Sequence, residues 1–346
     1  MDLLGLAEVA ELLGVTKQNI ANWRSRREDF PGPIANLKSG PVWAAEAILS
    51  WAESEEIEVQ YRPGEEAGEK AARNAVVVAM LNMKGGVGKS TLTANFGWHA
   101  AVRRDLRVLL IDLDPQFNLS QYVLGVNKFE NLIENNDPTI DELFKPLPHG
   151  KPRPSLSDLI QHVNDYDDDS CLHLVPARLE LAWSIKHSEQ VHILQDEISE
   201  IKNKYDLIII DCSPSESILT RAAYKASDYI AVPVKPEFLS TIGLPLVVKS
   251  IEEFGNLYPN DSTPEIIGII FNDVSDKIEH RRAKNSVRKT AKGLGIPIFE
   301  NEVGHSDSYP VGARKGQPIF WTGNARDTKK YELTKVATEF LNRIGL

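Results

Sequence analysis

A glycine-rich segment at residues 82–91, with the sequence NMKGGVGKST, has the composition of a phosphate-binding loop. It follows a run of small and β-branched residues, 76–81, and precedes a helical pattern, 92–102. Glycines let the backbone turn so that several N–H groups point at phosphate oxygens, and the helix N-terminus adds positive potential. The order strand, loop, helix therefore predicts a site for ATP. The residues expected to contact it are Gly85, Gly86, Val87, Gly88, Lys89, Ser90 and Thr91.

Two side chains at the end of this loop have specific roles in such a site. The Lys89 ammonium would neutralise the β- and γ-phosphates, and the Ser90 hydroxyl would be a ligand of Mg²⁺. An ordinary glycine-rich turn is the alternative interpretation. The strand before the loop and the helix after it disfavour that alternative.

Three carboxylates follow two other apolar runs. Asp112 and Asp114 come at the end of the run that starts at residue 108, and Asp211 follows four apolar residues, 207–210. Ligands of open α/β sheets bind in the crevice outside the carboxyl ends of the strands. We expect Asp114 to position the attacking water, Asp112 to lie near the Mg²⁺ shell and Asp211 to hold Mg²⁺ through water. Turn carboxylates are common, so the prediction depends on the loop and both carboxylate segments together.

Six apolar runs alternate with helical patterns in the sequence after residue 75. Strands that are apolar throughout are typical of a parallel sheet covered on both faces. The pattern predicts an α/β fold with a mostly parallel P-loop sheet and helices on both faces. Residues 125–169 are the exception, since they are polar and rich in proline, and we expect surface loops and short helices there. The runs are residues 76–81, 108–111, 172–175, 207–210, 229–234 and 266–271.

The composition changes near residue 60, which predicts two unequal domains. Residues 1–60 would form a small N-terminal domain and residues 75–346 the P-loop domain. Between them, residues 61–74 contain charges, a Pro-Gly pair and few large apolar residues, which is typical of a linker.

Residues 7–23 have the spacing of a helix-turn-helix. Small Ala10 and the turn residue Gly14 would let two helices cross closely, and Ile20 and Trp23 would fill the space between them. With the hairpin pattern that follows, the segment resembles a MerR-like or excisionase-like winged helix. A protein-binding helical domain is the alternative, because this region carries more acids than bases. The residues expected to face DNA are Lys17, Gln18, Asn19, Asn22, Arg24, Arg26 and Arg27, with Lys38 at the wing tip.

A second basic segment lies at residues 277–292. It holds seven lysines and arginines against one acid, Glu279. Such a density of basic residues in an acidic protein predicts a surface that contacts the phosphates of DNA. A helix that is merely solvated is the alternative. The residues expected to contact DNA there are Arg281, Arg282, Lys284 and Arg288.

The composition excludes several other classes of protein. A formal net charge of −10 argues against a uniformly basic DNA-coating protein. The two cysteines, Cys171 and Cys212, have neither metal-ligand spacing nor a disulfide framework, which fits a reducing cytoplasm. They also lack the matched spacing that an iron–sulfur relative would need. The first residues carry acids where a signal peptide needs bases. No apolar run reaches the roughly 18 residues of a membrane span, so we expect a cytoplasmic protein without a membrane partner.

Lys84 points to a particular group of P-loop proteins. A second lysine at this position, after Met83 in place of the usual first glycine, resembles the deviant Walker A group. The resemblance implies an ATP-bound homodimer in which Lys84 reaches the partner subunit's nucleotide. A cation at that position would stabilise charge on the transferred phosphate, as an arginine finger does. An exposed lysine without a role is the alternative.

Further segments make the chain similar to the ParA-type DNA-partition ATPases. The similarity is carried by residues 112–116 (DLDPQ), 210–215 (IDCSPS), 232–237 (VPVKPE) and 304–320. It implies an ATPase that binds bulk DNA as an ATP dimer and hydrolyses ATP when a ParB-like centromere-binding partner stimulates it. Asn272 stands where related ATPases contact adenine, although a turn asparagine is an equal alternative. The N-terminal domain would bind an operator.

Two rival functions remain open at this level. One is a MinD-like positioning ATPase at a membrane, because Val336, Phe340, Leu341 and Ile344 form a weakly amphipathic C-terminal pattern. Bases are few there, which favours packing on the sheet instead. The other is a transcription regulator that ATP switches.

Overall fold

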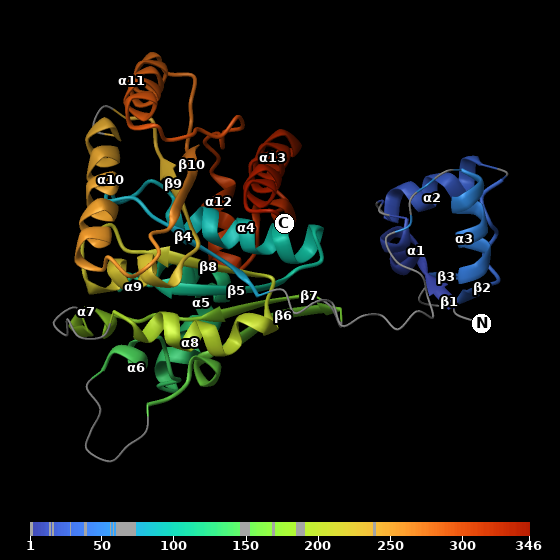
Figure 1. Cartoon of the computed structure of the whole chain (residues 1–346), viewed down its shortest axis with the longest axis horizontal. Coiled ribbons are helices and arrows are strands. Elements are labelled where there is room, and N and C mark those ends of the chain that lie inside the picture. The colour runs from blue at the N-terminus through green and yellow to red at the C-terminus, as the bar shows by residue number, and fades with distance from the viewer. Residues whose placement is uncertain are drawn as a thin grey trace. The chain divides into compact units, whose positions relative to one another are not determined.

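The computed structural model describes residues 3–13, 15, 17–27, 29–37, 40–55, 57, 59, 74–145, 153–167, 170–184, 191–237 and 240–346. The chain divides into two compact units, Met1–Arg73 and Asn74–Leu346. Figure 1 shows both units. The proposed wing tip at Lys38 and nearly all of the expected linker lie outside the described residues.

The larger unit is an α/β domain around a seven-stranded sheet. Its strand order is β10-β9-β4-β8-β5-β7-β6, and every neighbouring pair is parallel except β6 with β7. The phosphate-loop strand β4 lies inside the sheet, between β8 and β9. In chain order the strands are β4 (Val76–Met80), β5 (Arg107–Leu113), β6 (Gln161–Asp167), β7 (Ser170–Val175), β8 (Leu207–Cys212), β9 (Tyr229–Val234) and β10 (Glu265–Phe271).

Helices cover both faces of this sheet, as the alternation of apolar runs predicted. On one face lie α4 (Lys89–Arg103), α5 (Asn118–Glu134), α12 (Ser308–Lys315), η4 (Ile319–Trp321) and α13 (Asp327–Arg343). The opposite face is covered by α6 (Asp141–Phe144), η1 (Leu156–Leu159), α7 (Leu181–Ser184), α8 (Ile193–Ile201), η3 (Lys202–Lys204), α9 (Ile218–Ala226), α10 (Ser240–Leu257) and α11 (Ile278–Leu294).

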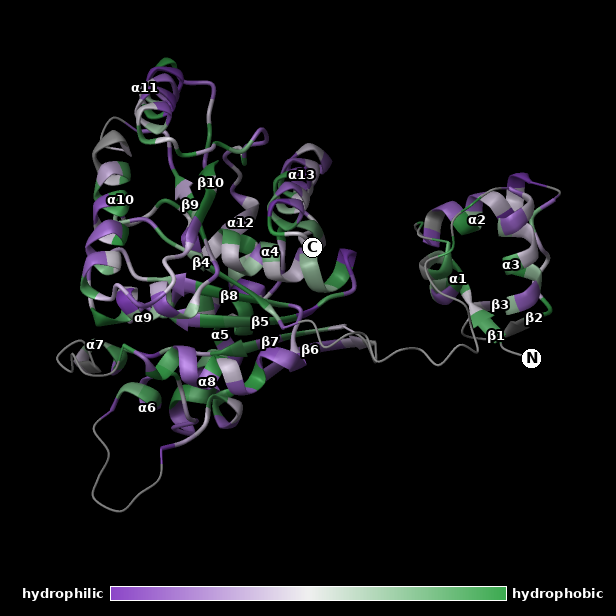
Figure 2. Ribbon diagram, in the orientation of Figure 1, coloured by the Kyte–Doolittle hydropathy of each residue, from purple (hydrophilic) through white to green (hydrophobic). Residues whose placement is uncertain are grey.

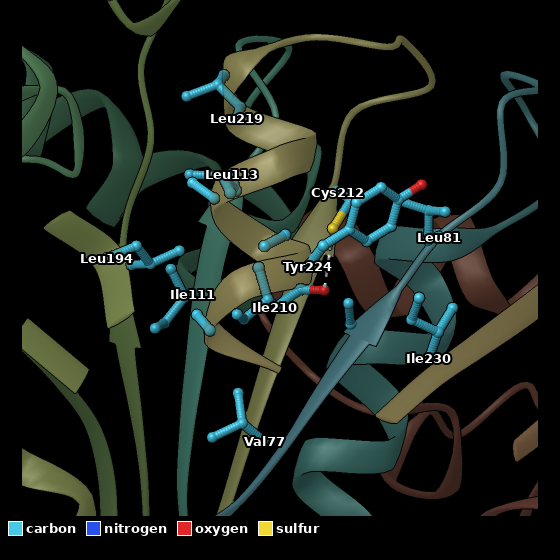
Figure 3. Close-up of a cluster of buried hydrophobic side chains, with 14 of the residues drawn as sticks. Val77, Leu81, Ile111, Leu113, Leu194, Ile210, Cys212, Leu219, Tyr224 and Ile230 are labelled. Carbon is cyan, nitrogen blue, oxygen red and sulfur yellow. Dashed lines mark hydrogen bonds between the residues drawn. The ribbon is translucent and has the colours of Figure 1, made fainter. Parts of the chain in front are cut away.

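The core consists of two apolar layers, one on each face of the sheet. Val77, Ile111 and Ile210 point from three neighbouring strands toward Leu194 of α8 and Tyr224 of α9 in one layer (Figure 3). Alternate residues of the same strands enter the other layer, beneath α4 and α13. Because the central strands are buried on both faces, they are apolar along most of their length, which Figure 2 shows in green. Asp112 near the end of β5 and Asp211 near the end of β8 are buried polar exceptions. Truncating one such side chain, for example Ile210→Ala, would cost about 2–5 kcal/mol.

Residues 125–169 differ from the prediction of surface loops and short helices. The first ten of them continue α5 beyond a kink at Gly125, which has φ 72°. Further along, α6 buries Leu143 and Phe144 in the core, and β6 adds an antiparallel edge strand. The predicted short helices are present as α6 and η1. The prediction was wrong for α5 and β6, because polar residues on the exposed side of these elements masked their periodicity.

The kink in α5 fits against the C-terminus of α12. Gly125 and Gly316 both have positive φ, and a Cβ on either would approach the backbone nitrogen of the other to 3.1 Å. Side chains are therefore excluded at both positions by conformation and by space. This contact, which we call the glycine contact, joins α5 to α12.

The smaller unit contains two helices, a hairpin and a third helix, in the order that the sequence predicts. The elements are β1 (Leu3–Gly5), α1 (Leu6–Leu12), α2 (Lys17–Arg26), β2 (Ala35–Leu37), β3 (Gly40–Ala44) and α3 (Ala45–Ser54). Strand β1, which the sequence did not predict, pairs with β3 and completes a three-stranded sheet. Ile20, Trp43 and Ile48 are fully buried, so this unit has its own core.

Within the described residues, none of the helices has the length and apolar character needed to cross a membrane. The C-terminal apolar residues lie in α13 and just after it. Val336, Phe340, Leu341 and Ile344 are buried against the sheet. That burial agrees with packing on the sheet, the arrangement that their pattern favours.

Candidate nucleotide-binding site

The glycine-rich loop connects the carboxyl end of β4 to the N-terminus of α4, which begins at Lys89. Gly86 and Gly88 adopt positive φ values of 72° and 91°. A Cβ on Gly88 would collide with the side chain of Asn272. Gly88 is thus required by both backbone conformation and space, which explains a glycine immediately before the lysine.

Lys89 is buried at the base of this loop. Its ammonium lies 3.3 Å from the carbonyl oxygen of Asn82 and 3.5 Å from that of Lys84. Two carbonyls position the ammonium, and within the described residues no carboxylate forms a hydrogen bond with it. A buried cation held in this way is ready to bind an anion.

A cavity of about 590 Å³ opens in front of the loop. Gly86, Gly88, Lys89, Ser90 and Thr91 form one wall of it. The rest comes from the start of α5, the end of β10 and residues 304–314. This volume is typical of a small-molecule site. The side chains outside the loop that line it include Gln121, Tyr122, Asn272, Asp273, His305, Tyr309 and Arg314.

Asp211 and Asp112 lie side by side on β8 and β5, where the two strands pair. Both side chains are fully buried. Burial, with the Asp112 charge as a second cause, raises the pKa of Asp211 well above its usual range. The neighbouring Ser90 hydroxyl and Lys89 ammonium act in the opposite direction. No hydrogen bond with ordinary geometry reaches either oxygen of Asp211 in the described structure.

Asp112 differs from Asp211 in its partners. Its carboxylate accepts hydrogen bonds from the backbone N–H and the hydroxyl of Ser120, at 2.8 and 2.6 Å, and from the N–H of Asp114 at 3.1 Å. Burial nevertheless raises the pKa of Asp112 to about 7. Asp112 therefore attaches the first turn of α5 to the end of β5. Asp211, with both oxygens available, is better suited to hold a metal ion.

Asp114 lies at the same edge of the sheet and is buried. One of its oxygens accepts the backbone N–H of Gln116 at 3.0 Å, which closes the turn before α5. The loop and the carboxylates that the sequence singled out are thus brought together by the carboxyl ends of β4, β5 and β8.

Asn272 contacts the loop itself. Its amide donates a hydrogen bond of 2.8 Å to the carbonyl of Val87, and it also lines the cavity. Sequence reasoning assigned no role to His305, Tyr309 or Arg314 in the same wall. The similarity of residues 304–320 to the partition ATPases was the signal that drew attention to this segment.

Lys84 forms an ion pair with a residue of its own chain. Its ammonium forms an ion pair of 2.6 Å with Glu237, which follows β9. Glu237 also contacts Lys235, and Lys235 contacts Asp273 at 3.0 Å. Hydrogen bonds from Lys84 and Lys235 lower the pKa of Glu237. The sequence analysis did not anticipate Glu237, because nothing local to its position indicates a partner 153 residues away.

The basic segment forms α11, which is strongly hydrophilic in Figure 2. Arg281, Arg282 and Arg288 are exposed, and Arg282 contacts Glu279. Lys284 differs, because it is half-buried and its ammonium pairs with Glu302. Both Lys284 and Arg288 lie near the ring of Phe271. The structure thus leaves the three arginines on the surface and places Lys284 against the domain.

In the smaller unit, α2 exposes Lys17, Arg24 and Arg26 and leaves Asn22 half-buried. The guanidinium of Arg27 instead contacts Asp29 and Glu55 and lies over the ring of Trp51. Arg27 therefore links α2 to the end of α3, which is a structural position. The side chains of Gln18 and Lys38 lie outside the described structure.

Comparison with known proteins places this geometry in a family. A family model described as an AAA domain matches residues 75–262. An uncharacterised protein of Methanocaldococcus jannaschii, MJECL24, is 31% identical over 71% of this chain and 90% of its own length. The chromosome-partitioning ATPase Soj of Treponema pallidum is 26% identical over 78% of this chain and 98% of its own length.

A solved structure has the same fold. The ATP complex of a single-residue variant of Cyanothece McdA aligns with a TM-score of 0.65 and 18% identity, covering 79% of this chain and 97% of the other. With the phosphate loop at the end of a central parallel strand, the fold is like that of the ParA-type P-loop ATPases. The chain belongs to the AAA-domain family, whose model matches the segment that runs along the chain from β4 to the end of α10 and includes every strand of the seven-stranded sheet except β10.

Proposed function

We propose that this protein is a DNA-partition ATPase of the ParA type. The observation that carries the proposal is the cavity at the carboxyl edge of the sheet, which the phosphate loop with Lys89 lines, while Asp211 is buried near the end of the neighbouring strand β8. Its relatives include a chromosome-partitioning ATPase, which supports the cellular role.

ATP is the ligand that suits this cavity. The loop N–H groups and the N-terminus of α4 would bind the phosphates, and the Lys89 ammonium would neutralise them. Asn272, Tyr309 and Arg314 line the remaining wall, where the nucleoside would lie. Ser90 and Asp211 fit Mg²⁺, because the hydroxyl adjoins a buried carboxylate whose two oxygens lack hydrogen bonds of ordinary geometry. Bound Mg²⁺ would neutralise charge on the β- and γ-phosphates.

The other charged residues of the site would have different roles in ATP hydrolysis. Asp114 would orient the attacking water, while Asp112 holds the turn that positions Asp114. Lys84 would leave Glu237 and reach the nucleotide of a second protomer in an ATP-dependent homodimer. Charge on the transferred phosphate then increases the attraction for that lysine as the reaction proceeds.

DNA binding would use two separate surfaces. The exposed arginines of α11 suit phosphates of any sequence. In the smaller unit, the two helices and the hairpin would form a winged helix-turn-helix that presents α2 to an operator. Lys17, Asn22, Arg24 and Arg26 are the α2 residues suited to that contact.

A centromere-binding partner would stimulate turnover, and the protein would act in the cytoplasm on the nucleoid. Burial of the apolar side of α13 supports this interpretation over a membrane-positioning ATPase, because that side is already covered. An ATP-switched transcription regulator is the second candidate, favoured by the separate core of the N-terminal unit.

The test is ATP turnover with and without non-specific duplex DNA. Asp114→Ala should bind ATP and form a stable dimer on DNA, but hydrolyse ATP about 100-fold more slowly, since positioned acid–base groups contribute about 10²–10⁴ in rate. Asp327→Ala, a change at a carboxylate whose side chain is fully exposed and does not line the cavity, is the control. Wild-type turnover by Asp114→Ala would remove that residue from catalysis. Failure of the wild type to bind DNA with ATP would overturn the partition role.

A further inference from the structure

A cluster of possible metal ligands lies at the opposite edge of the sheet from β10. His162 and Asp165 are on β6, and His173 is on β7. The Nε2 atom of His173 lies 2.9 Å from one oxygen of Asp165, and the Nδ1 atom of His162 lies 3.4 Å from the other. One ligand atom from each of the three residues falls within 4.8 Å of the other two.

The strand register explains how these residues come to share one face. His162 and His173 are opposite each other across the antiparallel pair. His162 and Asp165 are three residues apart, so a regular strand would place them on opposite faces. A bulge between His162 and Asn164 shifts the register and brings Asp165 opposite Cys171, two residues before His173. The bulge thus gathers all three side chains.

A second contact orients one of the imidazoles. The Nδ1 atom of His173 lies 2.8 Å from the hydroxyl of Tyr205. That partner leaves Nε2 to face Asp165. Metal-binding histidines usually have such a partner on the other ring nitrogen, since it fixes the tautomer and the orientation of the ring.

The distances suit a small divalent ion. Ligands 2.0–2.2 Å from a tetrahedral Zn²⁺ are separated from one another by about 3.3–3.5 Å. The 3.4 Å between His162 and one oxygen of Asp165 falls in that range, and the 2.9 Å between His173 and the other oxygen is shorter. With one ligand atom from each residue within 4.8 Å of the other two, an ion can be reached by small side-chain rotations. No lysine or arginine forms an ion pair with Asp165 in the described part of the chain. Two imidazoles and one carboxylate are typical ligands of zinc and other first-row transition metals.

We propose that His162, Asp165 and His173 form a binding site for a divalent transition metal, with Zn²⁺ as the natural fit. The site takes two nitrogens and one carboxylate oxygen and leaves a fourth position for water. Its bound ion fastens edge strand β6 to β7. It is separate from the Mg²⁺ site proposed beside the phosphate loop, whose ligands are hydroxyl and carboxylate oxygens.

The experiment uses the full chain without an affinity tag, freed of metal by a chelator and kept free of nucleotide. Co²⁺ is titrated while its visible absorption is recorded, and Zn²⁺ is then added in competition. One equivalent of Co²⁺ with strong d–d bands, displaced by Zn²⁺, is the expected result. In a melting experiment, Zn²⁺ should raise the Tm of the wild type.

His162→Ala and Asp165→Asn are the test variants. His162 is 67% exposed at its side chain and Asp165→Asn preserves shape, so both changes should leave the fold intact. Each should weaken Co²⁺ binding at least tenfold. His192→Ala, which removes an exposed histidine outside the cluster, should bind Co²⁺ as the wild type does.

Three outcomes would overturn the site. They are no saturable Co²⁺ binding by the wild type, unchanged binding by both test variants, and an equal loss in His192→Ala. Should one test variant fail to fold, the other decides, together with X-ray absorption of the Zn²⁺-loaded wild type. That spectrum must show two imidazole ligands for the proposal to stand.

Discussion

Charged side chains are arranged in opposite ways at the phosphate-loop edge of the sheet and along α11. At the loop, Lys89 and Asp211 are buried, and the carboxylate of Asp211 has no hydrogen bond of ordinary geometry in the described structure. Along α11, Arg281 and Arg288 are exposed to solvent. A buried charge without a partner costs stability, whereas an exposed one costs little. We therefore expect a bound ligand to stabilise the loop edge and to have little effect on the stability of α11.

Lys89→Ala should produce the largest effect on binding. Removing the ammonium deletes charge-assisted hydrogen bonds to phosphate, each worth about 1.5–3 kcal/mol, so ATP affinity should fall about 10- to 100-fold. Equilibrium binding of a fluorescent ATP analogue measures this. Lys289→Ala, which changes an exposed lysine of α11, should retain the affinity. Equal affinities for both variants would remove the distinction between the two regions.

Asp211→Asn should show directly how much the buried carboxylate lowers the free energy of unfolding. The raised pKa means that the metal-free folded state binds this proton more tightly than the unfolded state, whose carboxyl has a pKa near 3.8. Stability of the wild type should then fall as pH rises above about 4, as the linkage relation requires. The pKa of about 7 at Asp112 adds to the same trend between pH 4 and 7.

The amide cannot ionise, so the variant should melt on the order of 5 °C higher than the metal-free wild type at pH 8. The difference should vanish near pH 4. Mg²⁺ with ATP should stabilise the wild type more than the variant, because the variant retains the phosphate loop but lacks the carboxylate that holds Mg²⁺. Thermal melts at several pH values measure all three effects, and a flat difference across pH would contradict the assignment.

Replacing Arg281 and Arg282 by alanine should have a smaller and graded effect. Each lost phosphate contact lowers the slope of log K against log salt by about 0.9, so the double variant should lose nearly two units. Fluorescence anisotropy with random duplex, ATP and several salt concentrations gives the slope. Lys249→Ala with Lys335→Ala removes the same charge from exposed positions on other helices. If the two double variants behave alike, only net charge matters, and α11 is a solvated helix.

Glu237→Gln should have the smallest effect. The ion pair of Lys84 with Glu237 is partly exposed, and such pairs contribute about 0–1 kcal/mol. Releasing Lys84 should therefore strengthen ATP-dependent dimerisation by at most about fivefold. Sedimentation with a non-hydrolysable analogue measures the dimer, and Lys84→Ala should abolish it. Weaker dimerisation of Glu237→Gln would show that Glu237 positions the lysine for its partner instead of retaining it.

The same contrast explains what the sequence could predict. Most strands of the larger sheet were recognisable because burial on both faces favours apolar residues at nearly every position, and all six predicted strands are present, including edge strand β10. Edge strand β6, with the sequence QHVNDYD, escaped because only part of one face is covered and a bulge breaks its alternation. The kinked helix α5 escaped because Gly125 interrupts the pattern.

Within the site, the contiguous motif was predictable and the distant partners were not. The loop residues lie next to one another in sequence, so their spacing alone predicts the phosphate contacts. Glu237 and Tyr309 lie in segments whose family similarity was recognised, but nothing in those segments indicated which side chain would face the site. These two side chains approach the phosphate loop only because the strand order brings distant segments together, and that order cannot be read from the sequence. The same limit hid the cluster of His162, Asp165 and His173.

The glycine contact between α5 and α12 makes two walls of the nucleotide cavity behave as one mechanical part. Gln121 and Tyr122 belong to α5, and Tyr309 and Arg314 belong to α12. With no side chain between Gly125 and Gly316, the two backbones are in van der Waals contact and have no compressible layer to absorb a displacement. A push on either wall is transmitted to the other. A single methyl group at Gly125 would act as a wedge that changes the shape of a cavity whose lining residues it does not touch.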